Sequence, residues 1–315
     1  MKAVTIGCGD YLELANYSAS QFSRFSGLPT VVITDRELVK SFSDYKKVKF
    51  DLFSYVDDDD IIYFDADLTL VKEFDFGDLF TSSKTFYACR DLSNTAIIQR
   101  ESSIINADKN TYINSGFMKM NRIHHSGVME LAYEHSQRIR SEFSDQTFIN
   151  KALIDLGTPI QFVPVTFNYI NFNLKASRVM YPFGIHLNIN KHYTVNKDRL
   201  PAAVASLQEL VIDTDFKYRF DLLPIYAGMY EYDRVGLSKR IIEFRQDGTI
   251  GYNSKNMEVF WHPVEHIKTG ATSIIIDNYT DTTCVLHRSY AFNDVVFKGH
   301  WLKFEKSETA IKKIS

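Results

Sequence analysis

Two aspartates separated by one residue follow a short apolar run in the first quarter of the chain. Residues 61–64, Ile-Ile-Tyr-Phe, lead directly into Asp65, Ala66 and Asp67. The apolar run predicts a strand buried on both faces, and the carboxyl end of such a strand is where an α/β sheet presents its ligands. Two carboxylates there form a hard oxygen site that suits Mg²⁺ or Mn²⁺. Because Mg²⁺ is usually shared with substrate phosphates, the pair predicts a nucleotide or diphosphate ligand.

The elements that would position these carboxylates alternate along the first half of the chain. Short apolar runs predict strands at residues 3–6, 30–34, 61–64 and 85–88. Residues 12–25, between the first two strands, predict a helix. The opening strand, helix and strand form a βαβ unit, which implies a mostly parallel sheet with right-handed crossovers. The carboxyl ends of these strands would then face one crevice. A strand within residues 112–121, a helix over about residues 127–142 and a helix from Asp145 follow.

The pattern changes near residue 217, where short β-branched and aromatic runs alternate with turn signals such as Asp247-Gly248. This pattern predicts an antiparallel β-rich domain. We therefore divide the chain into an α/β domain at residues 1–213 and a smaller β-rich domain at residues 214–315. Aromatic side chains of the second domain could stack on sugars, but in short strands they more often form the core. Acceptor binding, formation of a homo-oligomer and docking to another enzyme all remain open for this domain.

The composition favours a globular protein that does not bind nucleic acid. Of the 315 residues, 45% are hydrophobic, and Lys and Arg (36) nearly balance Asp and Glu (39), so the formal charge is −3. Three distant cysteines without metal-ligand spacing are typical of a reduced protein, and we expect a cytoplasmic location. The apolar run at the start is too short for a signal-peptide core, and we expect no transmembrane segment. Peripheral membrane contact remains open.

Four motifs in order resemble those of GT-A glycosyltransferases, most closely family 8, which includes bacterial lipopolysaccharide galactosyltransferases and glycogenins. Residues 65–67 resemble the D-x-D motif of that family, and residues 113–117 resemble its N-[AS]-G segment. Residues 145–150 resemble its D-Q-x-x-x-N segment, and His186 lies where the family places a metal-binding histidine. The resemblance covers about residues 1–195. It implies a GT-A fold, which is Rossmann-like, for the first domain.

The resemblance also assigns roles to residues of the presumed crevice. It places Mn²⁺ or Mg²⁺ on Asp65, Asp67 and His186, with Ala66 between the aspartates in contact with the donor. It places Asn114 and Ser115 at the donor sugar, and Gln146 or Asp145 beside the reacting carbon. Lys191 would contact the diphosphate, although it stands one residue earlier than in the family pattern.

Further contacts with the donor are expected from the strand ends of such a fold. We expect Thr5, Gly7, Cys8 and Gly9 to touch the base or ribose, because a nucleotide that approaches the backbone favours glycine. Asp35, at the end of the second predicted strand, would hydrogen-bond the uracil or the ribose. Arg90 could pair with a phosphate, and Asp91 could hold sugar hydroxyls.

Each of these assignments has a plainer alternative. Asp35 could be an ordinary turn residue, Arg90 and Asp91 a surface pair, and Asn114 with Ser115 a turn before a strand. Asp145 and Gln146 could be the cap and first turn of a helix, which is compatible with a polar site. We interpret the acidic run at residues 57–60 as a solvated turn.

The sequence thus predicts a metal-dependent hexosyltransferase that uses a nucleotide sugar, with a UDP-sugar favoured, and a glycan or other hydroxyl acceptor. Family 8 enzymes retain the anomeric configuration, whereas inversion would need a carboxylate that deprotonates the acceptor. One alternative is a nucleotidyltransferase, but residues 7–11 lack the basic residue typical of its phosphate loop. The other is a catalytically silent sugar-binding or scaffold protein.

Overall fold

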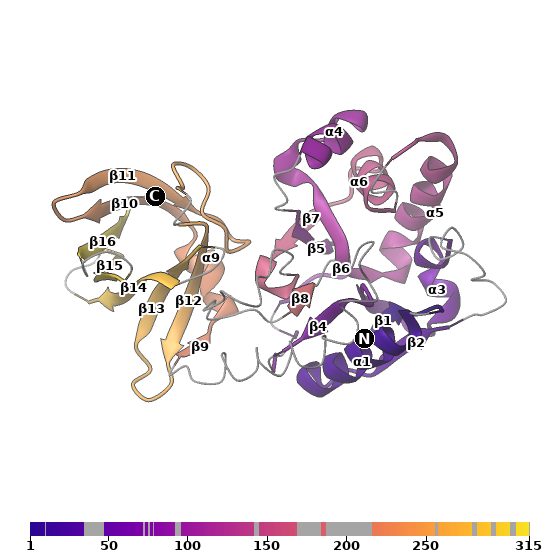
Figure 1. The fold of residues 1–315 in the computed structure, drawn as a ribbon, viewed down its shortest axis with the longest axis horizontal. Coiled ribbons are helices and arrows are strands. Elements are labelled where there is room, and N and C mark those ends of the chain that lie inside the picture. The colour runs from indigo at the N-terminus through magenta and orange to yellow at the C-terminus, as the bar shows by residue number, and fades with distance from the viewer. Residues whose placement is uncertain are drawn as a thin grey trace. The chain divides into compact units, whose positions relative to one another are not determined.

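The computed structural model describes residues 1–9, 11–34, 47–71, 73–74, 76–77, 79–91, 96–141, 145–168, 184–186, 216–255, 258–278, 282–290, 294–302 and 307–314. For residues 109 and 184–186 it describes the backbone alone. The chain forms two compact units, one with the described residues up to 186 and one with those from 216 onward (Figure 1). The predicted boundary between residues 213 and 214 lies outside the described residues.

The first unit is built on a sheet of six strands in the order β2-β1-β3-β6-β5-β7. Their bounds are β1 Lys2–Ile6, β2 Thr30–Ile33, β3 Asp60–Phe64, β5 Phe86–Arg90, β6 Ile113–Asn121 and β7 Ile160–Val163. β1 is parallel to β2 and β3, and β5 is parallel to β7, whereas β6 is antiparallel to both of its neighbours. The predicted mostly parallel α/β sheet is therefore confirmed.

Five α-helices accompany this sheet in the described part of the first unit: α1 Tyr11–Ser26, α3 Leu52–Tyr55, α4 Ala96–Ile104, α5 Arg122–Arg138 and α6 Asp145–Asp155. Residues 47–50 form a further helical turn. The shorter elements are β4 Leu68–Leu70, β8 Gly184–His186, and the 3₁₀ turns η1 Lys109–Thr111 and η2 Val165–Phe167. Helices α5 and α6 contact each other and β6, and α1 contacts β1, β2 and β4.

Two local features explain how close α1 packs and where α5 begins. Gly7 permits the close packing of α1, because a Cβ at this position would lie 2.6 Å from the Cβ of Ala15. Helix α5 begins at Arg122, five residues before the predicted start. The reason is that Asn121, the last residue of β6, caps it by accepting from the N–H groups of Ile123 at 3.0 Å and His124 at 3.3 Å.

The second unit is an antiparallel sheet in the order β11-β10-β16-β15-β14-β13-β12-β9, as the sequence predicts. The strands are β9 Phe216–Tyr218, β10 Gly228–Arg234, β11 Ser238–Phe244, β12 Phe260–His266, β13 Thr272–Asp277, β14 Thr282–Ser289, β15 Val296–Trp301 and β16 Glu308–Lys313, with η3 Phe220–Leu222 and α9 Leu223–Tyr226. Residues 248–251 hydrogen-bond to Glu243 of β11, to Val259, which precedes β12, and to Trp261 of β12. The sheet therefore curls back on itself (Figure 1).

Aromatic side chains form much of the core of this second unit. Tyr230, Phe244, Trp261 and Trp301 are all buried, and the rings of Phe244 and Trp261 stack with centroids 4.8 Å apart. Tyr252 is exposed. In the described part of the chain, no helix is long and apolar enough to cross a membrane.

Candidate active site

Three strands bring their ends together at one edge of the first sheet. β3 and β5 end there, and β6 begins there because it runs antiparallel between them. The N–H of Asp65, directly after β3, donates to the carbonyl of Gly116 at 2.9 Å. The N–H of Asp91, directly after β5, donates to the carbonyl of Tyr112 at 2.9 Å. The acidic pair and the predicted sugar-contacting segment therefore lie side by side.

Asp65 is held by two side chains that lie outside the four motifs. The hydroxyl of Tyr63 donates to Oδ1 of Asp65 at 2.7 Å, and Nζ of Lys49 donates to the same oxygen at 3.2 Å. The ammonium group of Lys49 also lies over the Tyr63 ring, 4.6 Å from its centroid. The first aspartate of the pair thus has a fixed orientation before any ligand binds.

Lys49 also joins the acidic pair to the first turn of α6. Its Nζ lies 2.6 Å from Oδ2 of Asp145 and donates to Oγ of Ser115 at 3.2 Å. The Lys49 side chain is only 2% exposed. Burial would lower the pKa of Lys49, but the carboxylates of Asp145 and Asp65 outweigh it, so that this pKa lies above its ordinary value. At neutral pH the site therefore contains a buried positive charge between two carboxylates.

A second network surrounds Asp91. Its Oδ2 accepts from Nδ2 of Asn114 at 3.2 Å and from Nε2 of Gln146 at 2.8 Å. Oε1 of Gln146 accepts from the N–H of Ser115 at 3.2 Å, which links this network to the one around Lys49. All four side chains are buried. The amide of Gln146 is held at both ends, and this arrangement preorganises the group that the resemblance places beside the reacting carbon.

The spacing between Gln146 and Asn150 has a structural reason. Asn150 lies one turn after Gln146 on α6, and its Nδ2 donates to the carbonyls of Ile113 at 3.0 Å and Gln146 at 2.9 Å. Its Oδ1 accepts from the N–H of Ile113 at 2.8 Å. Asn150 therefore fastens the first turn of α6 to the start of β6, where Asn114 and Ser115 follow.

The turn that carries Asp67 is supported from α1. Oγ of Ser18 donates to the carbonyl of Ala66 at 2.8 Å. β4 begins directly after Asp67 and pairs with β8 so that Leu68 lies opposite His186. The backbone of the predicted third metal ligand is thus close to the acidic pair, while its side chain lies outside the description.

The chemistry of this donor set fits a divalent ion. Two carboxylates from one turn and an imidazole from the paired strand are oxygen and nitrogen ligands of the kind that Mn²⁺ and Mg²⁺ accept. Among the side chains that the structure describes, no three His, Cys, Asp or Glu groups gather as a metal site. A site with all three ligands depends on His186, and it stays a prediction.

The residues predicted to contact the nucleotide lie at the end of β1. Thr5 is fully buried within the sheet, opposite Val32 of β2. Burial raises the pKa of the half-buried Cys8 thiol, which is therefore neutral at pH 7. Gly9 has φ +53°, a conformation that favours glycine. Asp35 lies outside the described residues.

Arg90 and Lys191 were predicted to contact phosphates. Arg90 is the last residue of β5, and its guanidinium lies over the ring of Phe162, 4.7 Å from the centroid. Lys191 lies outside the described residues. Contact of either residue with a phosphate stays a prediction.

The sequence contains one signal that could have pointed to Lys49. This lysine stands three and four residues before Leu52 and Phe53, so on a helix it shares an apolar face with them. A charged residue on such a face is either paired or functional when it is buried. Asn168, whose Nδ2 donates to Oδ1 of Asn114 at 2.6 Å, carries no comparable signal.

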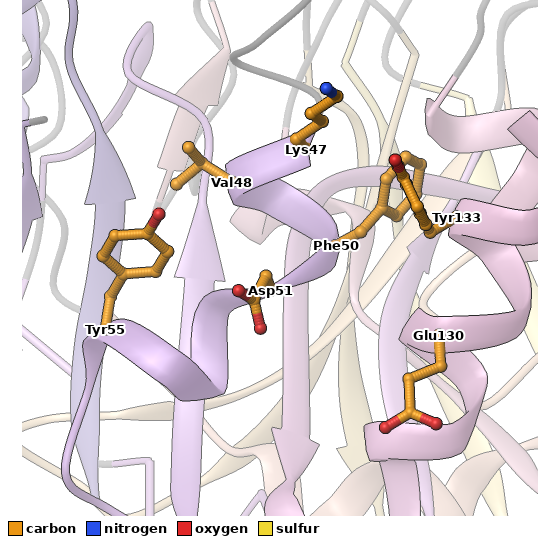
Figure 2. Close-up of a pocket in the computed structure, with 7 residues that line it drawn as sticks. All are labelled: Lys47, Val48, Phe50, Asp51, Tyr55, Glu130 and Tyr133. Atoms are coloured by element: carbon orange, nitrogen blue, oxygen red, sulfur yellow. The ribbon is translucent and has the colours of Figure 1, made fainter. Parts of the chain in front are cut away.

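The helical turn that carries Lys49 also borders a cavity of about 450 Å³. Figure 2 shows the side chains that line it: Lys47, Val48, Phe50, Asp51, Tyr55, Glu130 and Tyr133. Neither Lys49 nor any predicted site residue is among them. The cavity is therefore separate from the acidic network.

No known family model and no curated protein matches the sequence. Solved structures similar to this chain include galactosyltransferase LgtC in complex with donor and acceptor sugar analogues, with 14% identity, a TM-score of 0.46, and coverage of 65% of this chain and 96% of that chain. A glycosyltransferase involved in glycosylation of the major capsid of PBCV-1 has 8% identity, a TM-score of 0.47, and coverage of 64% and 98%.

The glycosyltransferase GlyE of Streptococcus pneumoniae TIGR4 has 12% identity, a TM-score of 0.43, and coverage of 67% of this chain and 64% of that chain. All three of these proteins are glycosyltransferases. Because the identities are 14% or less and the TM-scores are below 0.5, the functional assignment below is based on the residues of the site.

Proposed function

We propose that this chain is a metal-dependent glycosyltransferase that moves a hexose from a nucleotide sugar, with a UDP-sugar favoured, to a hydroxyl group of a glycan or other acceptor. The observation that carries this proposal is the network of Lys49. It joins Asp65 of one predicted motif to Ser115 of the second and Asp145 of the third. Three motifs that the resemblance assigns to a single donor are thus hydrogen-bonded to one side chain.

The residues of the network have distinct tasks in this proposal. Asp65, Asp67 and His186 hold Mn²⁺ or Mg²⁺, which when bound offsets the charge of the departing nucleoside diphosphate. Lys49 fixes Asp65 and Asp145 relative to each other, so that neither carboxylate has to reorganise when the donor enters. Preorganised charge of this kind is a large contributor to catalysis.

The second network supplies groups for the sugar. Asn114 and Asp91 present an amide and a carboxylate that suit sugar hydroxyls. In this proposal Gln146, which is held by Asp91 and the backbone of Ser115, is the polar group that stabilises an oxocarbenium-like transition state. By resemblance to family 8, we favour retention of the anomeric configuration.

The first test is calorimetric titration with UDP, GDP and dTDP, each with and without Mn²⁺, followed by an assay of donor hydrolysis. We expect one nucleotide to bind in a metal-dependent way. Asp67→Ala should reduce hydrolysis more than about a hundredfold, because it removes a ligand of a catalytic ion. The matched control is Asp57→Ala, an exposed aspartate of the acidic run, which should leave hydrolysis unchanged.

Three outcomes would contradict the proposal. An Asp67→Ala variant with full hydrolysis would remove the role of the acidic pair. Absence of binding by any nucleotide would favour the silent sugar-binding protein. Release of pyrophosphate from a nucleoside triphosphate and a sugar phosphate would identify a nucleotidyltransferase instead.

A further inference from the structure

In the second unit, buried polar atoms without a hydrogen-bond partner gather at one end of several neighbouring strands of the sheet. Among the described residues, no hydrogen-bond partner exists for four buried nitrogens: Nε of Arg234, Nε and Nη1 of Arg240, and Nε1 of Trp301. The strand register brings these residues to the same end of the strands. β10 and β15 end there, at Arg234 and Trp301, and Arg240 lies near the start of β11, which pairs with β10.

The same register places these side chains on one face of the sheet. Residues directly opposite in an antiparallel pair share a face, as do residues two apart on one strand. Tyr232 is opposite Arg240 and is two residues from Arg234. The guanidinium of Arg234 lies over the ring of Trp301, 4.0 Å from its centroid, and that of Arg240 lies 4.9 Å from the centroid of Tyr232. The four residues therefore form one cluster.

Among the described residues, one carboxylate pairs with this cluster. Glu258 is 1% exposed, accepts from the hydroxyl of Tyr232 at 3.1 Å and pairs with Nη2 of Arg240, whose side chain is 10% exposed. We call Tyr232, Arg234, Arg240, Glu258 and Trp301 the guanidinium cluster. Two guanidinium groups and one carboxylate leave it with a net charge of one positive unit.

The neighbouring thiol does not change this charge. Burial raises the pKa of Cys284 to about 12, so the thiol stays neutral. Cys284 lies opposite Trp301 in the pairing of β14 with β15.

The other tryptophan of the chain shows that the sheet can satisfy a buried indole internally. Nε1 of Trp261 donates to the carbonyl of Arg245 at 2.8 Å. Buried N–H groups without a partner are rare in native proteins, and each one is costly. A concentration of such groups at one end of the strands, with excess positive charge, therefore indicates a missing acceptor that carries negative charge.

We propose that the guanidinium cluster binds a small oxyanion, either a carboxylate or a phosphate group. The guanidinium group of arginine matches both groups in charge and in hydrogen-bond geometry. The indole N–H of Trp301 adds a directional donor. The hydroxyls of Thr282 and Ser307, which are buried and also lack a partner among the described residues, lie near Trp301 at the same end of the strands.

The test is calorimetric titration of the full chain with inorganic phosphate, glucose 6-phosphate, glucuronate and neutral glucose. We expect either the phosphates or glucuronate to bind, and the probe that binds identifies the oxyanion as a phosphate or a carboxylate. Glucose should not bind. Arg234→Gln should weaken that binding about tenfold or more, because it removes the guanidinium that has no carboxylate partner in the described part of the chain. Circular dichroism checks that the variant folds.

The matched control is Lys239→Gln. Lys239 is exposed on the same strand as Arg240, and its ammonium pairs with Glu231 rather than with the cluster. The substitution Lys239→Gln removes the same charge as Arg234→Gln, so an equal loss of anion affinity in both variants would overturn the proposal. Equal binding of glucose and the anions would also overturn it. A crystal structure with only ordered water at Arg234, Arg240 and Trp301, after soaking in the tightest-binding anion, would do the same. The result does not depend on glycosyl transfer, since the cluster lies in the second unit.

Discussion

Lys49 is the residue on which the arrangement of the first unit depends most directly. Its buried ammonium group lies between the partly exposed carboxylates of Asp65 and Asp145, at 3.2 and 2.6 Å. A buried ion pair is a weak source of stability by itself, but removal of one partner leaves the other charge uncompensated. Lys49 is therefore needed both for the fold of the site and for its charge.

Lys49→Met should lower the free energy of unfolding by about 3 kcal/mol, because two carboxylates lose their shared partner. The rate of donor hydrolysis should fall together with the free energy of unfolding. Urea unfolding and the hydrolysis assay measure the two effects. The control is Lys47→Met, an exposed lysine of the same helical turn, which should change neither quantity. If Lys49→Met were as stable as the original chain, the two carboxylates would not need the lysine.

The residue scale also shows what sequence can and cannot predict. Asp65, Asn114, Ser115, Asp145 and Gln146 were predicted from motifs, and the structure places all five in connected hydrogen-bond networks. Lys49 and Tyr63 were not predicted as site residues, because their role depends on partners brought near by the sheet. Sequence spacing alone does not encode such tertiary contacts.

At the scale of elements, the acidic run at residues 57–60 illustrates the same limit. We interpreted it as a solvated turn, but three of its carboxylates have cationic partners. Asp58 lies 3.2 Å from the N-terminal ammonium, Asp59 lies 3.4 Å from Nε of Arg122, and Asp60 lies 2.7 Å from Nζ of Lys119. Asp57 and Asp59 are exposed, as a solvated turn requires, but Asp60 belongs to β3. The ion pairs were not predictable, because the cations come from Met1, Lys119 of β6 and Arg122 of α5.

Gly7→Ala should destabilise the first unit by about 1–3 kcal/mol, because the new Cβ would lie 2.6 Å from the Cβ of Ala15 and force α1 away from β1. The matched control is Gly127→Ala on α5, where a Cβ meets no atom within 4 Å. There the same substitution should stabilise slightly, because alanine favours helix. Denaturant unfolding of both variants measures the difference, and equal effects would contradict the packing explanation.

His125 should make the junction of β6 and α5 sensitive to acid. The side chain is fully buried, and its Nδ1 accepts from the N–H of Asn121 at 2.8 Å, so that protonation would remove an acceptor. Burial is the main cause that lowers its pKa to about 4. Well above about pH 6.5 the ring is neutral in both the folded and the unfolded state. As the pH falls from there toward 4, the unfolded chain takes up a proton that the folded chain does not, so stability decreases by on the order of 2 kcal/mol.

Urea unfolding between pH 7.5 and 4 measures this effect. His125→Asn keeps an acceptor near Asn121 and does not titrate, so its stability should depend less on pH over this range. His124→Asn, an exposed neighbour, should retain the full dependence of the original chain. The same pH dependence in all three proteins would exclude His125 as its source.

At the scale of the whole molecule, the two proposed ligand sites belong to different compact units. The acidic network lies in the first unit, and the guanidinium cluster lies in the second. The antiparallel architecture of the second unit was predictable from its short alternating runs and turn signals. Its guanidinium cluster was not, because Arg234, Arg240 and Trp301 meet only through strand pairing.

Hydrogen exchange on the full chain can therefore report on the two sites separately. A ligand that binds only the folded state stabilises it by about 2.7 kcal/mol at a concentration 100 times its Kd. With Mn²⁺ and the nucleotide that binds, we expect added protection in peptides from β3 and β6. With the oxyanion that binds, we expect it in peptides from β10, β11 and β15. Protection by the oxyanion confined to the first unit would contradict the guanidinium cluster alone, because the nucleotide response would still stand. Absence of nucleotide protection in β3 and β6 would contradict the donor site alone.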